Sequence, residues 1–189
     1  MWDIGCDHGL LGLSFVGNKS IQSIHLVDPS KDVINVLQKK VVDSYITDKP
    51  FIHIHQMKGQ SVILDSLSKT IFIAGMGGRE IGEIIQHLLP QLSTNDRVVI
   101  SPHRNILELR KYLNSTDLRL IDEVLIKEDG QFYQILCLSM VPECLKVPLF
   151  GEKIWQGQLG REYRDYQIRF FSFHQDEQSQ TYLSYLKCL

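Results

Sequence analysis

Short apolar runs alternate with longer helical patterns along the first 140 residues, and this alternation constrains the fold more than any other feature. Five runs indicate β-strands, because each is short and bounded by Gly, Pro, Asp or Asn. They are Trp2–Ile4, Ser23–Val27, Phe51–His55, Thr70–Ala74 and Arg97–Ser101. Strands that alternate with helices are joined by right-handed crossovers. The predicted fold class is therefore α/β, a doubly wound and mostly parallel sheet with helices on both faces.

Three apolar stripes at helical spacing predict the connecting helices. The first helix runs from Ser30 to Tyr45, and the third follows Asn105, which we expect to cap it. The stripes are Val33, Ile34, Leu37, Val41 and Tyr45, then Ile81, Ile84, Ile85, Leu88 and Leu89, and finally Ile106, Leu109 and Leu113.

After Asn114 the pattern changes to two long strand-like runs, Leu118–Lys127 and Phe132–Ser139. Glycine in the four-residue link between them permits a tight turn, which predicts a terminal antiparallel hairpin. From Leu145 onward the strand pattern stops. We expect a sheet domain over residues 1–145 and a small helical segment over residues 146–189.

Four aromatic residues of this last segment share one side of a predicted helix. Tyr163, Tyr166, Phe170 and Phe173 are three, four and three residues apart. Such a seam usually packs on the domain or on a partner helix, and we favour that interpretation over base stacking.

Size and composition limit the remaining choices. A chain of 189 residues can bury a full core, and its net charge of −2 gives no global electrostatic case for nucleic acid. There is no apolar run of about 18 residues and no signal-peptide pattern at Met1, so we expect a cytoplasmic protein without a membrane partner. Four scattered cysteines predict reduced thiols and no metal site.

The segment Asp3-Ile4-Gly5-Cys6-Asp7-His8-Gly9 closes the first strand and precedes a helix expected near Leu10. Glycines allow a tight turn and let backbone N–H groups approach a ligand. Asp28 ends the second strand, where a carboxylate can accept hydrogen bonds from both ribose hydroxyls of a nucleotide-like cofactor. In the alternative interpretation, Gly5 and Gly9 only form a turn and Asp28 caps the next helix.

The acidic side chains of this loop distinguish two cofactor classes. A dinucleotide-binding loop has the pattern G-x-G-x-x-G, but Asp7 takes the place of the second glycine. Asp3 and Asp7 would also repel a pyrophosphate. S-adenosylmethionine has no phosphate and carries a cationic sulfonium and an amino group. The loop therefore favours S-adenosyl-L-methionine as cofactor.

Two further clusters follow the fourth and fifth strands. Ala74-Gly75-Met76-Gly77-Gly78 has little side-chain bulk, so a flat group could lie against its backbone. Ser101-Pro102-His103-Arg104-Asn105 supplies an imidazole, a guanidinium and an amide. Because ligands of open α/β sheets bind at the carboxyl ends of the strands, we expect both clusters beside the first loop. His103 is either a proton acceptor or a surface hydrogen-bonding residue.

In order and spacing, three motifs resemble the bacterial TrmK family of tRNA (adenine-N1)-methyltransferases, which act on adenine 22. They are residues 3–9, the stretch Ile73-Ala74-Gly75-Met76-Gly77-Gly78, and Glu128-Asp129-Gly130-Gln131-Phe132-Tyr133. The similarity covers about residues 1–150. It implies a Rossmann-like class I methyltransferase fold that uses S-adenosyl-L-methionine, has a helical C-terminal domain and acts on tRNA.

The motifs and the resemblance together assign candidate site residues. Candidates for cofactor binding are Asp3, Gly5, Cys6, Asp7, His8, Gly9, Asp28, Pro29, Lys58, Gly59, Ala74 and Gly75. Candidates for the catalytic centre are Gly75, Met76, Gly77 and His103, and candidates for substrate binding are Gly78, Arg79 and Arg104. We expect the contacts to RNA phosphates to come from six basic residues: Arg79, Arg104, Arg110, Lys111, Arg161 and Arg164.

Three departures from the family pattern leave other functions open. Met57-Lys58-Gly59 replaces a Gly-Asp-Gly stretch, Ser101-Pro102-His103 replaces Gln-Pro-Asn, and no helical segment precedes the first strand. A lysine cannot accept a hydrogen bond from the cofactor adenine. The alternatives are an RNA- or protein-binding relative that has lost cofactor binding, and a methyltransferase of small molecules.

Overall fold

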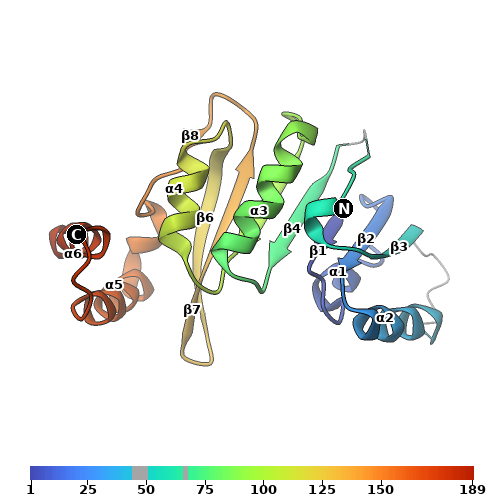
Figure 1. Ribbon diagram of the computed structural model, residues 1–189, viewed down its shortest axis with the longest axis horizontal. Coiled ribbons are helices and arrows are strands. Elements are labelled where there is room, and N and C mark those ends of the chain that lie inside the picture. The colour runs from blue at the N-terminus through green and yellow to red at the C-terminus, as the bar shows by residue number, and fades with distance from the viewer. Residues whose placement is uncertain (44–50, 66–67) are drawn as a thin grey trace.

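The protein, seen in a computed structural model that describes residues 1–43, 51–65 and 68–189, is built on one twisted sheet (Figure 1). The strand order in the described residues is β3-β2-β1-β4-β5-β7-β6-β8. The first five strands of this order pair in parallel, and the others pair antiparallel. The parallel strands are β1 (Trp2–Ile4), β2 (Ser23–Asp28), β3 (Phe51–Gln56), β4 (Thr70–Ala74) and β5 (Arg97–Ser101). The predicted α/β fold class is confirmed.

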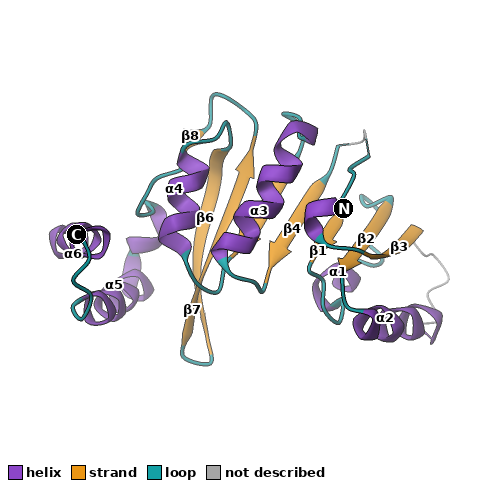
Figure 2. Cartoon of the chain, viewed as in Figure 1, coloured by secondary structure: helices purple, strands orange, loops and turns teal. Residues whose placement is uncertain are grey.

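Helices cover both faces of the sheet, as the alternating pattern predicts. On one face lie α1 (Leu10–Ser14) and α2 (Lys31–Asp43). On the other lie α3 (Gly78–Leu88) and α4 (Ile106–Asn114), which cross the middle of the sheet in Figure 2. The first predicted helix agrees with α2, although Tyr45 of its stripe lies outside the described residues.

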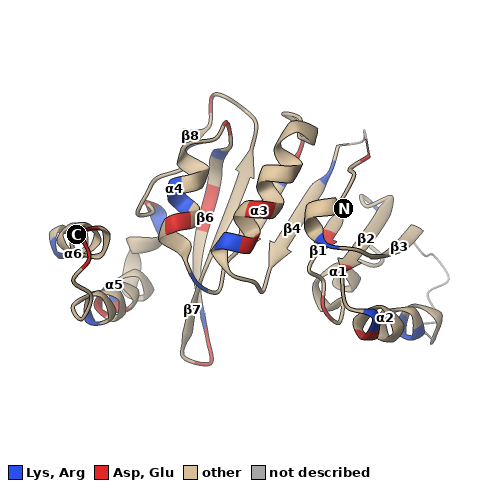
Figure 3. Cartoon of the chain, in the orientation of Figure 1, with Lys and Arg blue, Asp and Glu red and all other residues tan. Residues whose placement is uncertain are grey.

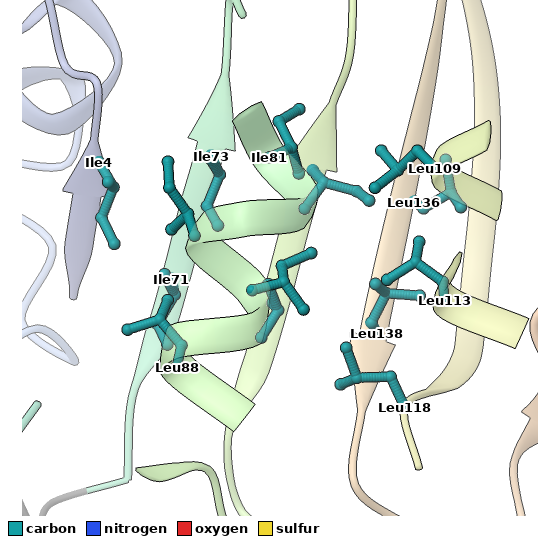
Figure 4. Packing of buried hydrophobic residues seen from close by; sticks show 14 of the residues in the cluster. Ile4, Ile71, Ile73, Ile81, Leu88, Leu109, Leu113, Leu118, Leu136 and Leu138 are labelled. Atoms are coloured by element: carbon teal, nitrogen blue, oxygen red, sulfur yellow. The ribbon is translucent and has the colours of Figure 1, made fainter. Parts of the chain in front are cut away.

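The larger core lies between the sheet and the two helices α3 and α4. Figure 4 shows branched side chains from both layers meeting there. Residues of β1 and β4 contribute from the sheet side, and the predicted stripes of α3 and α4 contribute from the helix side. They include Ile4, Ile71, Ile73, Ile81, Leu88, Leu109 and Leu113, each no more than 2% exposed. This packing holds the carboxyl ends of β1, β4 and β5 in fixed positions.

The predicted hairpin is confirmed as β6 (Arg119–Glu128) and β7 (Gln131–Ser139). Its turn consists of Asp129 and Gly130, with φ angles of 47° and 79°. These left-handed conformations suit the right-handed twist of the strands, which is why a glycine is needed there. A further strand that the pattern did not predict, β8 (Leu145–Lys146), pairs with β6.

The C-terminal segment forms α5 (Gly157–Phe171) and α6 (Glu177–Cys188) at the end of the molecule opposite α1 and α2 (Figure 1). Within the predicted aromatic seam, Tyr163 is 4% exposed and packs against Phe132 and Trp155. The seam is otherwise not buried: Tyr166 is 41% and Phe170 is 50% exposed. Phe173 follows the end of α5, so the prediction that it belongs to the helical seam is wrong.

A buried polar network joins the sheet domain to the C-terminal segment. Arg110 of α4 is 1% exposed and lies 2.5 Å from the Glu123 carboxylate. It also donates hydrogen bonds to the Gln134 side chain and to the Pro148 carbonyl. Glu123 in turn accepts hydrogen bonds from the backbone N–H groups of residues 152 and 153. The prediction that Arg110 contacts RNA phosphates is wrong, because its guanidinium is buried and hydrogen-bonded inside the protein.

A stack of aromatic rings crosses the strands at the other end of the sheet. The ring of His25 lies 4.0 Å from the Trp2 ring and 4.6 Å from the His53 ring, centre to centre. Its Nδ1 is 3.1 Å from Nε2 of His55. Burial, together with the neighbouring His53 and His55, lowers the pKa of His25 to about 4, and the Asp65 carboxylate only partly offsets this.

We expect this histidine to weaken the fold in acid. Because its pKa in the folded state lies below its ordinary value, the unfolded chain binds a proton first. Stability is therefore complete above about pH 6.5 and falls as the pH decreases towards 4. On acidification over this range, the melting temperature of the wild type should fall more than that of His25→Phe, which keeps a stacking ring. Parallel curves would contradict the expectation.

Candidate functional site

The carboxyl ends of the five parallel strands meet at one edge of the sheet, where a cavity of about 850 Å³ opens between α3 and α4. Its wall includes Ile4 and Gly5 from the end of β1, Pro29 after β2, and the loops after β3, β4 and β5. The prediction that the three glycine and polar clusters come together is confirmed. A ligand in this cavity would contact segments that are far apart in the sequence.

The glycine loop after β1 is folded tightly onto β2. The N–H groups of Gly5 and Cys6 both donate to the Val27 carbonyl, and Gly9 N–H donates to Cys6. Gly5 and Gly9 have φ angles of 74° and 69°, so the predicted need for glycine at the turn is confirmed. These N–H groups are hydrogen-bonded inside the protein, so polar contacts to a ligand must come from other atoms of the site.

Asp28 links this loop to the start of α2. Its Oδ2 accepts a hydrogen bond from Asp7 N–H at 3.3 Å, and its Oδ1 accepts one from Ser30 N–H at 2.8 Å. The alternative interpretation of Asp28 is therefore confirmed in part, because the carboxylate orders the backbone before α2. Each carboxylate oxygen has a further lone pair, so the same group retains capacity for ribose hydroxyls.

Burial raises the pKa values of two side chains at the loop after β1. Asp3 is buried beneath the loop, where it accepts a hydrogen bond of 2.8 Å from Gly12 N–H, and burial raises its pKa to about 6. Burial raises the pKa of the Cys6 thiol to about 12, assisted by the charges of Asp3 and Asp28. Cys6 is therefore a neutral packing group and not a nucleophile.

The loops after β4 and β5 are packed against each other. Gly78 N–H donates to the Arg104 carbonyl at 2.8 Å, and His103 N–H donates to the Met76 carbonyl at 3.0 Å. A Cβ at Gly78 would lie 2.5 Å from the Asn105 carbonyl oxygen. The backbone of residues 104 and 105 fills the space beside Gly78, and the Arg104 side chain lies beside Gly77, although both glycines still border the cavity.

Open space remains at Gly75, where a Cβ would meet nothing within 4 Å. Its φ of 78° lies in the left-handed region, so the backbone conformation by itself favours glycine here. Met76 lines the cavity and reaches across to the first loop, because a Cβ at Gly5 would lie 2.3 Å from its Cε. The two predicted centres, the loop after β1 and the loop after β4, are therefore in direct contact.

The loop after β3 forms the third side of the cavity. Gly59 is buried there, and a Cβ would lie 2.7 Å from Ile4 Cγ2 and 2.8 Å from Ile84 Cδ1. Close packing therefore requires glycine at position 59. The neighbouring Lys58 is exposed and lines the cavity together with Pro29.

The predicted site residues divide into two groups. Those that line the cavity are Gly5, Pro29, Lys58, Gly59, Met76, Gly77, Gly78, Arg79 and Arg104. Those that do not are Asp3, Cys6, Asp7, His8, Gly9, Asp28, Ala74, Gly75 and His103, of which His103 lines a neighbouring cavity. The roles of these residues stay predictions.

Several cavity residues have no counterpart among the predictions. They come from the exposed sides of α3 and α4, where three acidic residues contribute charge: Glu80, Glu83 and Glu108. Tyr112 lies one helical turn after Glu108. Residues four apart lie on the same side of a helix. Once the first turn of α4 is known to border the site, this spacing from Glu108 indicates that Tyr112 also lines the cavity.

Basic residues around the site are few and dispersed. At the start of α3, Figure 3 shows basic and acidic positions side by side, which are Arg79 and Glu80. Lys111 and Arg161 are exposed, whereas Arg164 is half-buried. Phosphate contacts from these residues stay predictions.

In the described part of the chain, no His, Cys, Asp and Glu side chains gather in a group of three or more that could hold a metal ion. None of its helices has both the length and the apolar character of a membrane span.

Comparison with known proteins gives the family. A family model for a methyltransferase domain matches residues 1–136. The tRNA (adenine(22)-N(1))-methyltransferase of Bacillus subtilis is 29% identical over 151 residues. That match covers 72% of this chain and 56% of the relative, so the chain spans little more than half of the relative's length.

Solved structures of this group have the same fold. The Streptococcus pneumoniae protein Sp1610 in complex with S-adenosyl-L-methionine is 22% identical, with a TM-score of 0.81 over 98% of this chain and 89% of that one. The M1A22 tRNA methyltransferase TrmK of B. subtilis is 23% identical, with a TM-score of 0.77 over 99% and 87%. These similarities confirm the resemblance to the TrmK family that the motifs indicate. With most of its length matched by the family model, the chain belongs to the methyltransferase domain family.

Proposed function

We propose that this protein transfers a methyl group from S-adenosyl-L-methionine to ring nitrogen N1 of an adenine in tRNA, in the cytoplasm. The observation that carries the proposal is the cavity at the carboxyl edge of the sheet, where the loops after β1, β3, β4 and β5 converge. The B. subtilis relative is named for this reaction at adenine 22, and we propose the same target position here.

The residues of this edge fit S-adenosyl-L-methionine. Asp28 retains lone pairs for the ribose hydroxyls, and Pro29, Lys58 and Gly59 form a wall beside it for the adenine ring. Carboxylates at Asp7 and Asp28 suit a cofactor that carries positive charge. When bound, the cofactor supplies an electrophilic methyl group on a sulfonium.

Residues 74–79 and 103–104 are proposed to receive the target base. N1 of neutral adenine has an available lone pair, so the reaction mainly requires correct placement of the base. Gly75 leaves room for a flat ring, while Arg79 and Arg104 offer positive charge for RNA phosphates. We assign His103 to accept the proton that the adenine amino group later loses.

Methyl transfer to tRNA tests this function. Labelled S-adenosyl-L-methionine and unmodified tRNA should give incorporation, and nucleoside analysis should find 1-methyladenosine. The matched control is the same tRNA with guanine in place of the target adenine, which should stay unlabelled. Absence of incorporation together with absence of calorimetric cofactor binding would instead favour the RNA- or protein-binding relative that has lost cofactor binding.

A further inference from the structure

A second cavity, of about 630 Å³, lies beside the first, between the loop after β5, the start of β7 and the pair α5 and α6. Arg104, Asn105 and Glu108 line both cavities. One short segment therefore separates the two spaces. A polymeric ligand with one unit in the first cavity is able to place a neighbouring unit in the second.

Aromatic rings form much of the second cavity. The rings of Phe132 and Tyr166 are 5.4 Å apart, the ring of Phe170 is 4.8 Å from that of His174, and all four residues line the cavity. Tyr166 and Phe170 are 41% and 50% exposed, although they belong to the same helix as the buried Tyr163. Tyr163 is buried against the domain and Tyr166 also contacts Phe132, but the rings of Tyr166 and Phe170 keep exposed surface.

Polar groups accompany these rings. The amides of Gln131, Gln167 and Gln178 line the same space, and an amide both donates and accepts hydrogen bonds. Arg104 contributes a positive charge at the shared wall. Flat rings, amides and a cation are the groups with which proteins bind unstacked nucleobases and their phosphates.

We propose that the second cavity binds an unpaired nucleobase of the RNA substrate, next to the target adenine and stacked on Tyr166 and Phe170. The inference rests on the proposed function, because it places a second nucleotide of the same substrate. A base that is extruded into the first cavity loses its stacking, and a stacked neighbour in the second cavity compensates for part of that loss.

A double variant, Tyr166→Ala with Phe170→Ala, tests the proposal through binding of unmodified tRNA, measured by fluorescence anisotropy without cofactor. Loss of both stacking rings should weaken tRNA binding about 10-fold to 100-fold. The matched control is Phe173→Ala, since Phe173 is 86% exposed, belongs to the same segment and lies outside the cavity. Both variants should bind S-adenosyl-L-methionine as the wild type does, and Tyr166→Phe should bind tRNA normally.

Unchanged tRNA affinity in the double variant would overturn the proposal, as would an equal loss in Phe173→Ala. Failure of the proposed function is recognised separately. If the wild type binds tRNA through these rings but transfers no methyl group, the second cavity stands and the proposed activity falls. If the wild type methylates tRNA and the double variant has normal affinity, only the nucleobase site is excluded.

Discussion

Arg110→Met should lower the free energy of unfolding by about 3–5 kcal/mol, because it leaves a buried carboxylate without its cation. Arg110 is enclosed by Glu123, Gln134 and the Pro148 carbonyl. Methionine keeps much of the side-chain volume, so the loss reports the charge and the hydrogen bonds. Chemical denaturation measures it, with Lys111→Met as control on the exposed side of the same helix.

The pH dependence of this loss identifies its cause. Burial raises the pKa of Glu123, but the charge and hydrogen bonds of Arg110 and two backbone N–H groups outweigh burial and hold that pKa below its usual value. In Arg110→Met, burial is no longer offset by the Arg110 charge and should raise the pKa of Glu123, so the stability deficit should shrink as the pH falls. Adding Glu123→Gln should recover part of it. A deficit that is constant with pH and unrelieved by Glu123→Gln would indicate lost packing instead.

The burial of Arg110 was not predicted, although its spacing carried a signal, and its partner had no signal in the sequence. Ile106, Leu109 and Leu113 define the apolar side of α4, and Arg110 is four residues after Ile106, on that same side. A charged residue within an apolar stripe indicates burial with a partner. Glu123 comes from another strand, however, and only the tertiary structure brings the two together.

The glycines after β4 show a similar limit. Their sequence predicted a site with little side-chain bulk, and this holds at Gly75. At Gly78 the space is taken by the Asn105 backbone, 27 residues later in the chain. Such a contact has no local periodicity, because it depends on the neighbouring positions of β4 and β5 in the sheet.

Local patterns were sufficient for the five parallel strands, since each has a short apolar run and a clear boundary, but they did not predict β8. They were also sufficient for the shared edge of the site, because parallel strands end on the same side. The second cavity required the position of α5 and α6 against β7. All three of Tyr163, Tyr166 and Phe170 line the cavity, and no spacing within α5 shows that Tyr163 is buried while the other two keep exposed surface.

Asp28→Ala should weaken the binding of S-adenosyl-L-methionine by about 100-fold or more. Two hydrogen bonds from ribose hydroxyls to a carboxylate would be lost, and bonds to charged groups contribute about 1.5–3 kcal/mol each. The same substitution removes the bonds that Asp28 accepts from Asp7 and Ser30 N–H, at a stability cost of about 0.5–2 kcal/mol. Calorimetric titration and melting temperature measure the two effects separately.

Asp28→Asn separates ribose binding from loop structure. Asparagine can accept the Ser30 N–H bond and preserve the turn before α2, but it lacks the charge and the second acceptor oxygen. We expect its melting temperature to match the wild type while cofactor affinity stays well below it. If Asp28→Ala binds the cofactor normally, the ribose assignment is wrong. If Asp28→Asn retains full affinity, Asp28 acts only through the backbone N–H of Ser30.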